Sequence, residues 1–207
     1  MIVCDPQREE NFQEFIRLRN DPDYYDVIFD EKSGGVSAIH KEHQFDKTVG
    51  PFGYKRGLYE RIVLTALRKH GHRIILNKED SGLYLIKTCD GFLDGKTAEI
   101  KTIEGDGKWA IRTKIEVARK QNASCIILFF PTPETFSAKR IQSGWNDYLK
   151  ANPGEEGGQC VISYDGFPVI FLNVSKSRMA GREESPSGEL PAAPSRRRSY
   201  IPAAVPF

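Results

Sequence analysis

The sequence predicts an α/β fold in which helices flank a mixed central sheet. Its expected elements run helix, strand, hairpin, helix, strand, helix, hairpin, an order typical of a sheet covered by helices. Residues 124–130 (SCIILFF) form a nearly continuous apolar run, which is typical of a strand covered on both faces. Asp94-Gly95 separates two strand-forming runs and therefore predicts a two-residue hairpin.

Length and composition limit the class of protein. A chain of 207 residues, 39% of them apolar, can bury one core, so we expect a single domain with tails. A net charge of +2 is too small to indicate nucleic-acid binding by itself. The four cysteines form no CxxC or Cys/His cluster, which favours free thiols in a reducing compartment. Without a secretory or membrane-spanning pattern, we expect a cytoplasmic location, including delivery into the cytoplasm of a target cell.

Three regions follow from the order of the elements. Residues 1–33 are polar and are expected to form a loosely docked N-terminal arm with a short helical pattern. Residues 34–176 are expected to form the domain, and residues 177–207 a disordered basic and proline-rich tail. Within the tail, Arg196–Arg198 could contact nucleic acid or remain solvated.

The elements of the domain are justified by local patterns. Periodic apolar residues predict helices, short apolar or alternating runs predict strands, and Gly71 and Asp165-Gly166 predict a helix end and a turn. The expected helices are residues 57–70, 109–121 and 135–149. The expected strands are residues 27–29, 36–40, 73–76, 83–88, 124–130, 161–164 and 168–174, together with the two strands of the Asp94-Gly95 hairpin.

The central hairpin carries the candidate chemistry. If Asp94 and Gly95 form the turn, Asp90 lies opposite Glu99, and strand alternation places Lys101 on the same face as both acids. Two opposed carboxylates repel each other, and a divalent cation would remove that conflict. The alternative is a salt-bridge cluster on a solvated sheet face.

Further polar residues leave alternatives open. Glu60 lies at the edge of an otherwise apolar helix face, where it is either a third site carboxylate, or the partner of Arg56 or Arg61, or solvated at the helix start. His40 and His43 have a spacing that would place both on one helix face. We expect surface or accessory histidines there rather than a structural zinc site, because no third ligand lies at a suitable spacing.

These residue types suit metal-assisted hydrolysis of phosphodiesters. Asp90 and Glu99 would provide hard oxygen ligands, so Mg²⁺ or Mn²⁺ is expected rather than Zn²⁺. Lys101 would orient or help deprotonate a water molecule and balance developing negative charge.

The order of Asp90, a short hairpin and Glu99-Ile100-Lys101, after a helix carrying Glu60, resembles the PD-(D/E)xK nuclease superfamily. More narrowly, the hairpin, the EIKT segment and the helix ending in Lys120-Gln121 look like the C-terminal tRNA nuclease domain of contact-dependent growth inhibition (CdiA) toxins and their phage and mobile-element relatives. The resemblance covers residues 34–176, and Cys89 stands where the superfamily often has proline.

The resemblance implies a restriction-endonuclease-like core, tRNA as substrate and an immunity protein as a partner of a toxin. It assigns catalysis to Asp90, Glu99 and Lys101, with Glu60 and Gln121 as further candidates, and metal binding to Asp90 and Glu99. The basic residues expected to follow a phosphate backbone are Lys108, Arg112, Lys114, Arg119 and Lys120. Two alternatives remain: a metal-dependent DNA endonuclease, and a non-catalytic nucleic-acid- or protein-binding module with the same fold.

Overall fold

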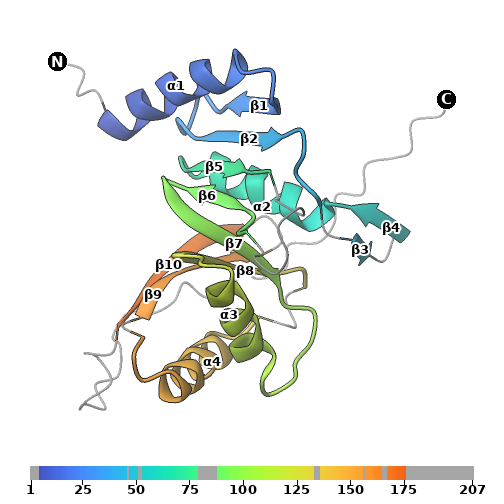
Figure 1. Ribbon diagram of the computed structural model, residues 1–207, viewed down its shortest axis with the longest axis vertical. Coiled ribbons are helices and arrows are strands. Elements are labelled where there is room, and N and C mark those ends of the chain that lie inside the picture. The colour runs from blue at the N-terminus through green and yellow to red at the C-terminus, as the bar shows by residue number, and fades with distance from the viewer. Residues whose placement is uncertain are drawn as a thin grey trace, which may run out of the picture. The chain divides into compact units, whose positions relative to one another are not determined.

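The computed structural model describes residues 5–45, 47–50, 53–78, 88–132, 136–155, 157–164 and 167–175, with the backbone alone in 47–56 and 157–175. It confirms an α/β architecture built on one mixed sheet (Figure 1). In sheet order the eight strands are β1 (Tyr24–Phe29), β2 (Val36–His40), β5 (Arg73–Leu76), β6 (Gly91–Leu93), β7 (Lys96–Thr102), β8 (Cys125–Phe130), β9 (Gly157–Tyr164) and β10 (Phe167–Ser175). The pairs β2–β5, β7–β8 and β8–β9 are parallel and the others antiparallel.

Four helices cover this sheet. The helices are α1 (Pro6–Arg19), α2 (Leu58–Lys69), α3 (Ala110–Lys120) and α4 (Ala138–Ala151), and a separate two-stranded hairpin is formed by β3 (Lys47–Gly50) and β4 (Gly53–Arg56). In β8, Ile127 packs with the α2 residues while Ile126 and Leu128 pack with α3 and α4. Alternate residues of one strand therefore face two different helical layers, as the unbroken apolar run predicts.

Helix α1 lies on the same sheet face as α3 and α4. Ile75 of β5 packs with Leu18 of α1, whereas its neighbours Ile74 and Leu76 pack with α2. Since successive side chains of a strand point to opposite faces, one face carries α2 and the other carries α1, α3 and α4. In Figure 1, α1 lies beside β1 and β2, and α3 and α4 lie beside the other end of the sheet.

The N-terminal segment is part of the compact unit Met1–Lys176 rather than a loosely docked arm. Strand β1 pairs with β2, Leu18 is fully buried, and the buried Asn11 amide donates to the carbonyl oxygens of Gly34 and Gly71. These contacts are long-range and therefore invisible in the mostly polar pattern of residues 1–33.

The remaining expectations are met in part. The strands of the final hairpin pair as predicted. Residues 83–87, Asp165-Gly166 and the predicted disordered tail lie outside the described residues. Among the described helices, none combines the length and apolar character that crossing a membrane requires.

Replacing Gly91 with alanine is expected to destabilise the fold. A Cβ at this position would overlap the carbonyl oxygen of Ile75 on the neighbouring strand β5. The backbone must then shift, so we expect Gly91→Ala to lower the free energy of unfolding by about 1–3 kcal/mol. Thermal and urea unfolding measure this effect. Gly105→Ala is the matched control because nothing lies within 4 Å of its added Cβ, and an equal loss in both variants would contradict the packing argument.

Candidate active site

The central hairpin has the predicted register. Gly91, Phe92 and Leu93 pair with Ala98, Thr97 and Lys96. Asp94 and Gly95 both have positive φ, 49° and 81°, as a type I′ turn requires. The Asp94 carboxylate accepts the backbone N–H of Arg73 at 2.8 Å and contacts His72 Nδ1 at 2.8 Å. Asp94 therefore ties the turn to β5 and takes no part in the candidate site.

Asp90 and Glu99 lie opposite each other and are joined through the backbone. The Asp90 N–H donates to Glu99 Oε2 at 2.8 Å, and the Ile100 N–H donates to Asp90 Oδ2 at 2.7 Å. Lys101 Nζ forms an ion pair with Glu99 Oε1. The structure thus brings together the three residues that the sequence selected.

The site is buried rather than solvated. The Glu99 side chain is 1% exposed and that of Lys101 15%, which excludes a solvated salt-bridge cluster. Burial, and then the Glu99 charge, raise the pKa of Asp90 well above its usual value. Burial also raises the pKa of Glu99, although Lys101 opposes that shift. The single positive charge of Lys101 does not neutralise two carboxylates.

Glu60 belongs to the same charge cluster. It is buried in the first turn of α2, and its charge contributes to raising the pKa of Asp90. One of the expected arginine partners is committed elsewhere, because Arg61 pairs with Asp26 at 2.6 Å. The side chain of the other, Arg56, lies outside the described residues. These contacts favour the reading of Glu60 as a third site carboxylate.

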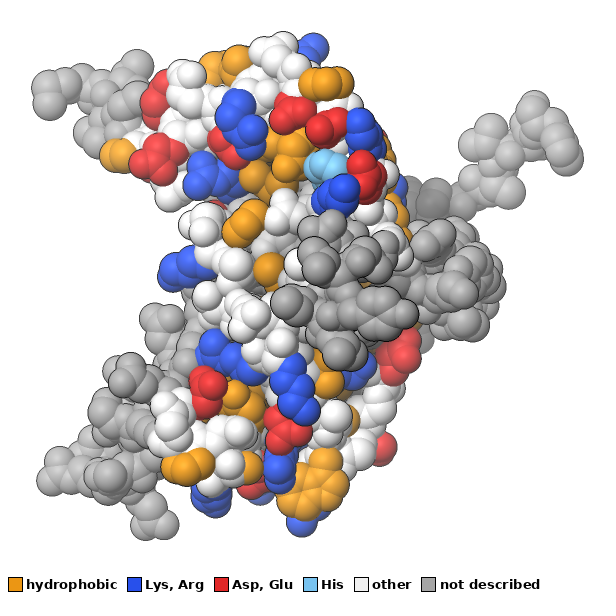
Figure 2. Space-filling view, viewed as in Figure 1, with side chains coloured by type: hydrophobic (Ala, Val, Ile, Leu, Met, Phe, Trp, Pro, Cys, Tyr) orange, Lys and Arg blue, Asp and Glu red, His pale blue; other side chains and the backbone are white. Residues whose placement is uncertain are grey.

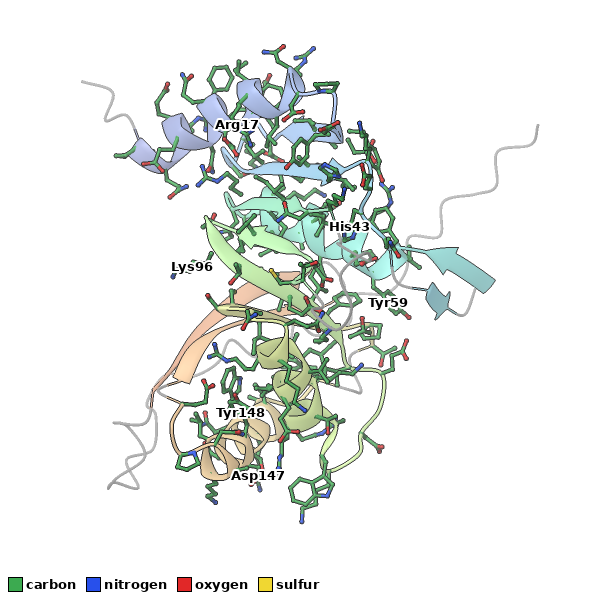
Figure 3. All side chains as sticks on the ribbon, viewed as in Figure 1. Arg17, His43, Tyr59, Lys96, Asp147 and Tyr148 are labelled. Carbon is green, nitrogen blue, oxygen red and sulfur yellow. The ribbon has the colours of Figure 1, made fainter. Side chains whose placement is uncertain are left out.

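His43, for which the sequence left an accessory role open, contacts Glu60. Its Nε2 lies 3.5 Å from Glu60 Oε1, and its Nδ1 donates to the Asn77 carbonyl oxygen at 2.9 Å. The Asn77 N–H in turn donates to the Asp90 carbonyl oxygen at 2.8 Å. In Figure 3, His43 and Tyr59 lie on the right of the sheet and Lys96 lies on the left. His43 therefore links Glu60 to the backbone that carries Asp90.

His40 and His43 do not lie on one helix face. His40 ends β2, where its ring packs against Tyr24 with centroids 5.2 Å apart, and His43 lies in the following turn. Their spacing therefore gave no information about the site. The contact that matters joins positions 43 and 60 across the fold, and only the burial of Glu60 hinted at a partner.

Gln121 also reaches the site. It is the residue after the last turn of α3, its side chain hydrogen-bonds Glu99, and its Nε2 donates to the Thr88 carbonyl oxygen at 3.4 Å. Its buried Oε1 has no hydrogen-bond partner among the described residues. Gln121 therefore holds Glu99 while keeping an acceptor available inside the site.

The basic residues of α3 and its approach divide into two groups. Lys108, Lys114 and Lys120 are exposed, and Lys108 Nζ lies 4.6 Å from the Trp109 ring centroid. Arg112 pairs with Glu116 at 3.0 Å, and Arg119 donates to the Ala123 carbonyl oxygen at 3.1 Å. The two arginines expected to bind phosphate thus have partners within the protein. The three exposed lysines are therefore the stronger candidates for contact with a phosphate backbone.

The donor set suits a hard divalent cation. Asp90, Glu99 and Glu60 offer carboxylate oxygens, and the raised pKa values of the first two identify acids whose charge is poorly compensated. Over the described ranges, no three His, Cys, Asp or Glu side chains already stand in the arrangement of a metal site. The side chains would have to rotate to bring three oxygens onto one ion.

Comparison with protein families, curated proteins and solved structures finds no match to this chain.

Asp90→Asn should stabilise the protein in the absence of divalent cations. Because folding raises the pKa of Asp90, the folded state binds the proton more tightly than the unfolded chain, whose aspartate titrates near about 4. The wild type therefore loses stability as pH rises from about 4 to the folded pKa, and the asparagine variant avoids this loss. We expect a gain of about 1 kcal/mol or more near pH 8, which is a rise of about 2–4 °C in Tm.

Melting curves in EDTA between pH 4.5 and pH 8 measure this gain. Asp106→Asn is the control, since Asp106 is exposed. A gain independent of pH, or equal in both variants, would contradict the assigned charge conflict.

Proposed function

We propose that this protein is a metal-dependent nuclease that hydrolyses phosphodiester bonds in RNA, with tRNA as the favoured substrate. The observation that carries the proposal is the buried convergence of Asp90, Glu99 and Lys101. Asp90 directly precedes β6, and the Glu-x-Lys residues lie on the adjacent strand β7 of a mixed sheet flanked by helices, an arrangement similar to the PD-(D/E)xK core that the sequence resembles. RNA is favoured over DNA by the resemblance to toxin tRNA nuclease domains.

Each residue has a role that its position supports. Asp90 and Glu99 would hold Mg²⁺ or Mn²⁺, which would polarise the phosphate and lower the pKa of a bound water molecule. Lys101, which forms an ion pair with Glu99, would orient that water molecule and compensate negative charge developing on the phosphate oxygens. Glu60, held by His43, adds a third carboxylate, and Gln121 fixes Glu99.

Purified protein should cleave total tRNA when Mg²⁺ or Mn²⁺ is present and not in EDTA. Lys101→Ala and Asp90→Ala should each lower the cleavage rate by at least about 100-fold, because the first removes a group that would act on the water and phosphate and the second removes a ligand of the metal ion. Gel assays with end-labelled tRNA measure the rate. Glu104→Gln is the matched control, since Glu104 is exposed and lies beyond the site.

Intact tRNA with every metal would refute the proposal. Nicking of plasmid DNA under the same conditions, dependent on Asp90, would instead support the DNA endonuclease alternative.

Divalent cations should stabilise the folded protein through the two acids. A ligand that binds only the folded state stabilises it by about 2.7 kcal/mol at 100 times its Kd. We therefore expect Mn²⁺ to raise the Tm of the wild type and of Glu104→Gln by several degrees but to leave Glu99→Gln unchanged. Differential scanning fluorimetry over a Mn²⁺ titration measures this. An equal rise in all three proteins, or none, would favour a non-catalytic module.

A further inference from the structure

The sheet face that carries the site continues past it toward the hairpin turn. In the parallel register, Glu99 and Lys101 pair with Ile126 and Leu128, so these acid and base side chains lie on the face of α3 and α4. Thr97 shares that face by alternation, and Phe92 lies directly opposite Thr97. Phe92 is two residues from Asp90 along the chain, a distance of about 7 Å in a strand.

Phe92 is left uncovered between the helices of this face. It is 37% exposed, although it lies on a central strand of the sheet. On one side, α1 covers β1 and β2, and on the other side α3 and α4 pack beyond β7. Figure 2 shows hydrophobic side chains at the surface between these two covered regions. The sheet therefore presents an aromatic ring to solvent beside the candidate site.

A pocket of about 290 Å³ lies next to this ring. It is lined by Glu14, Arg73, Ile75, Phe92 and Gly95. Glu14 projects from α1 and is held by two hydrogen bonds from Arg17, at 2.8 and 2.9 Å. The Arg73 guanidinium lies near two carboxylates, since its positive charge helps to lower the pKa values of Glu14 and Asp94. The pocket thus combines an aromatic ring, a cation and a fixed carboxylate acceptor.

We propose that this pocket binds an unpaired nucleobase of the substrate, close to the scissile phosphate. This inference rests on the proposed nuclease function and adds that the substrate is single-stranded where it crosses β6. The base stacks on Phe92, Arg73 contacts a phosphate or the base edge, and Glu14 accepts a hydrogen bond from base N–H groups. A paired base cannot offer its face to a side chain on a sheet surface, so the pocket selects loops and ends.

RNA binding by full-length Phe92 variants tests the pocket. The probe is a fluorescein-labelled ten-nucleotide RNA, single-stranded or annealed to its complement, followed by anisotropy in EDTA so that no strand is cut. Phe92→Ala and Phe92→Leu should weaken binding of the single strand by about 5- to 150-fold, as loss of one stacked base predicts, while Phe92→Tyr should stay close to the wild type. The leucine variant keeps the apolar volume and so separates stacking from folding.

Two further variants sharpen the test. Phe12→Ala removes a phenylalanine that is 39% exposed but packs on Phe15 and Phe29, and it should bind as the wild type does. Arg73→Ala should weaken binding and reduce the salt dependence of binding by about one counterion.

The outcomes separate this inference from the nuclease proposal. Phe92→Ala could cleave tRNA with an unchanged KM and bind the single strand as tightly as the wild type. That result would overturn the base-binding pocket and leave the nuclease proposal intact. Failure to cleave any substrate, with single-strand binding that still depends on Phe92, would overturn the nuclease and keep the pocket. Equal loss of single-strand and duplex binding in Phe92→Ala, or no binding by the wild type, would also overturn the pocket.

Discussion

The arrangement of this site depends on the cross-strand pair Asp90 and Glu99, in which each carboxylate accepts a backbone N–H from the other strand. These hydrogen bonds hold two like charges together and fix their orientation at once. They also require one register, because a slip of one residue would turn Glu99 toward the apolar layer under α2. The Asp94-Gly95 turn sets that register, and Gly91 allows β5 to approach the hairpin closely enough to complete the sheet.

Around this pair the fold gathers groups from elements far apart in sequence. Glu60 comes from α2, Gln121 from the end of α3, and His43 from the turn after β2. His43 reaches the pair through two steps, the Asn77 carbonyl oxygen and the Asn77 N–H that bonds Asp90. A change at His43 would therefore alter both the Glu60 carboxylate and the strand that carries Asp90, although His43 itself lies outside the Asp-Glu-Lys motif.

The sequence predicted what is encoded locally and missed what is encoded by tertiary contact. The Asp-Gly turn has a specific backbone requirement, so the register and the shared face of Glu99 and Lys101 followed from it. The apolar run of residues 124–130 likewise predicted a central strand. The sequence predicted a loosely docked arm in place of α1 because only a few residues of this helix are apolar. Its packing on the sheet depends on the Asn11 amide and on Leu18. The sequence predicted the place of Phe92 in the hairpin but not its exposure to solvent, since a strand pattern does not show which part of a sheet the helices leave uncovered.

Under the proposed nuclease function, the burial of the two acids has a physical reason. Burying opposed carboxylates destabilises the metal-free fold, and isosteric amides would keep both backbone hydrogen bonds without the repulsion. A binding module that needed only the fold would gain stability from such a replacement and would lose nothing. The unfavourable charges are supported instead by Lys101, by Gln121 and by a buried histidine on Glu60. Groups that hold repelling acids in place, beside an aromatic ring left open to solvent, have a physical reason to exist if a cation and a nucleic-acid strand bind there.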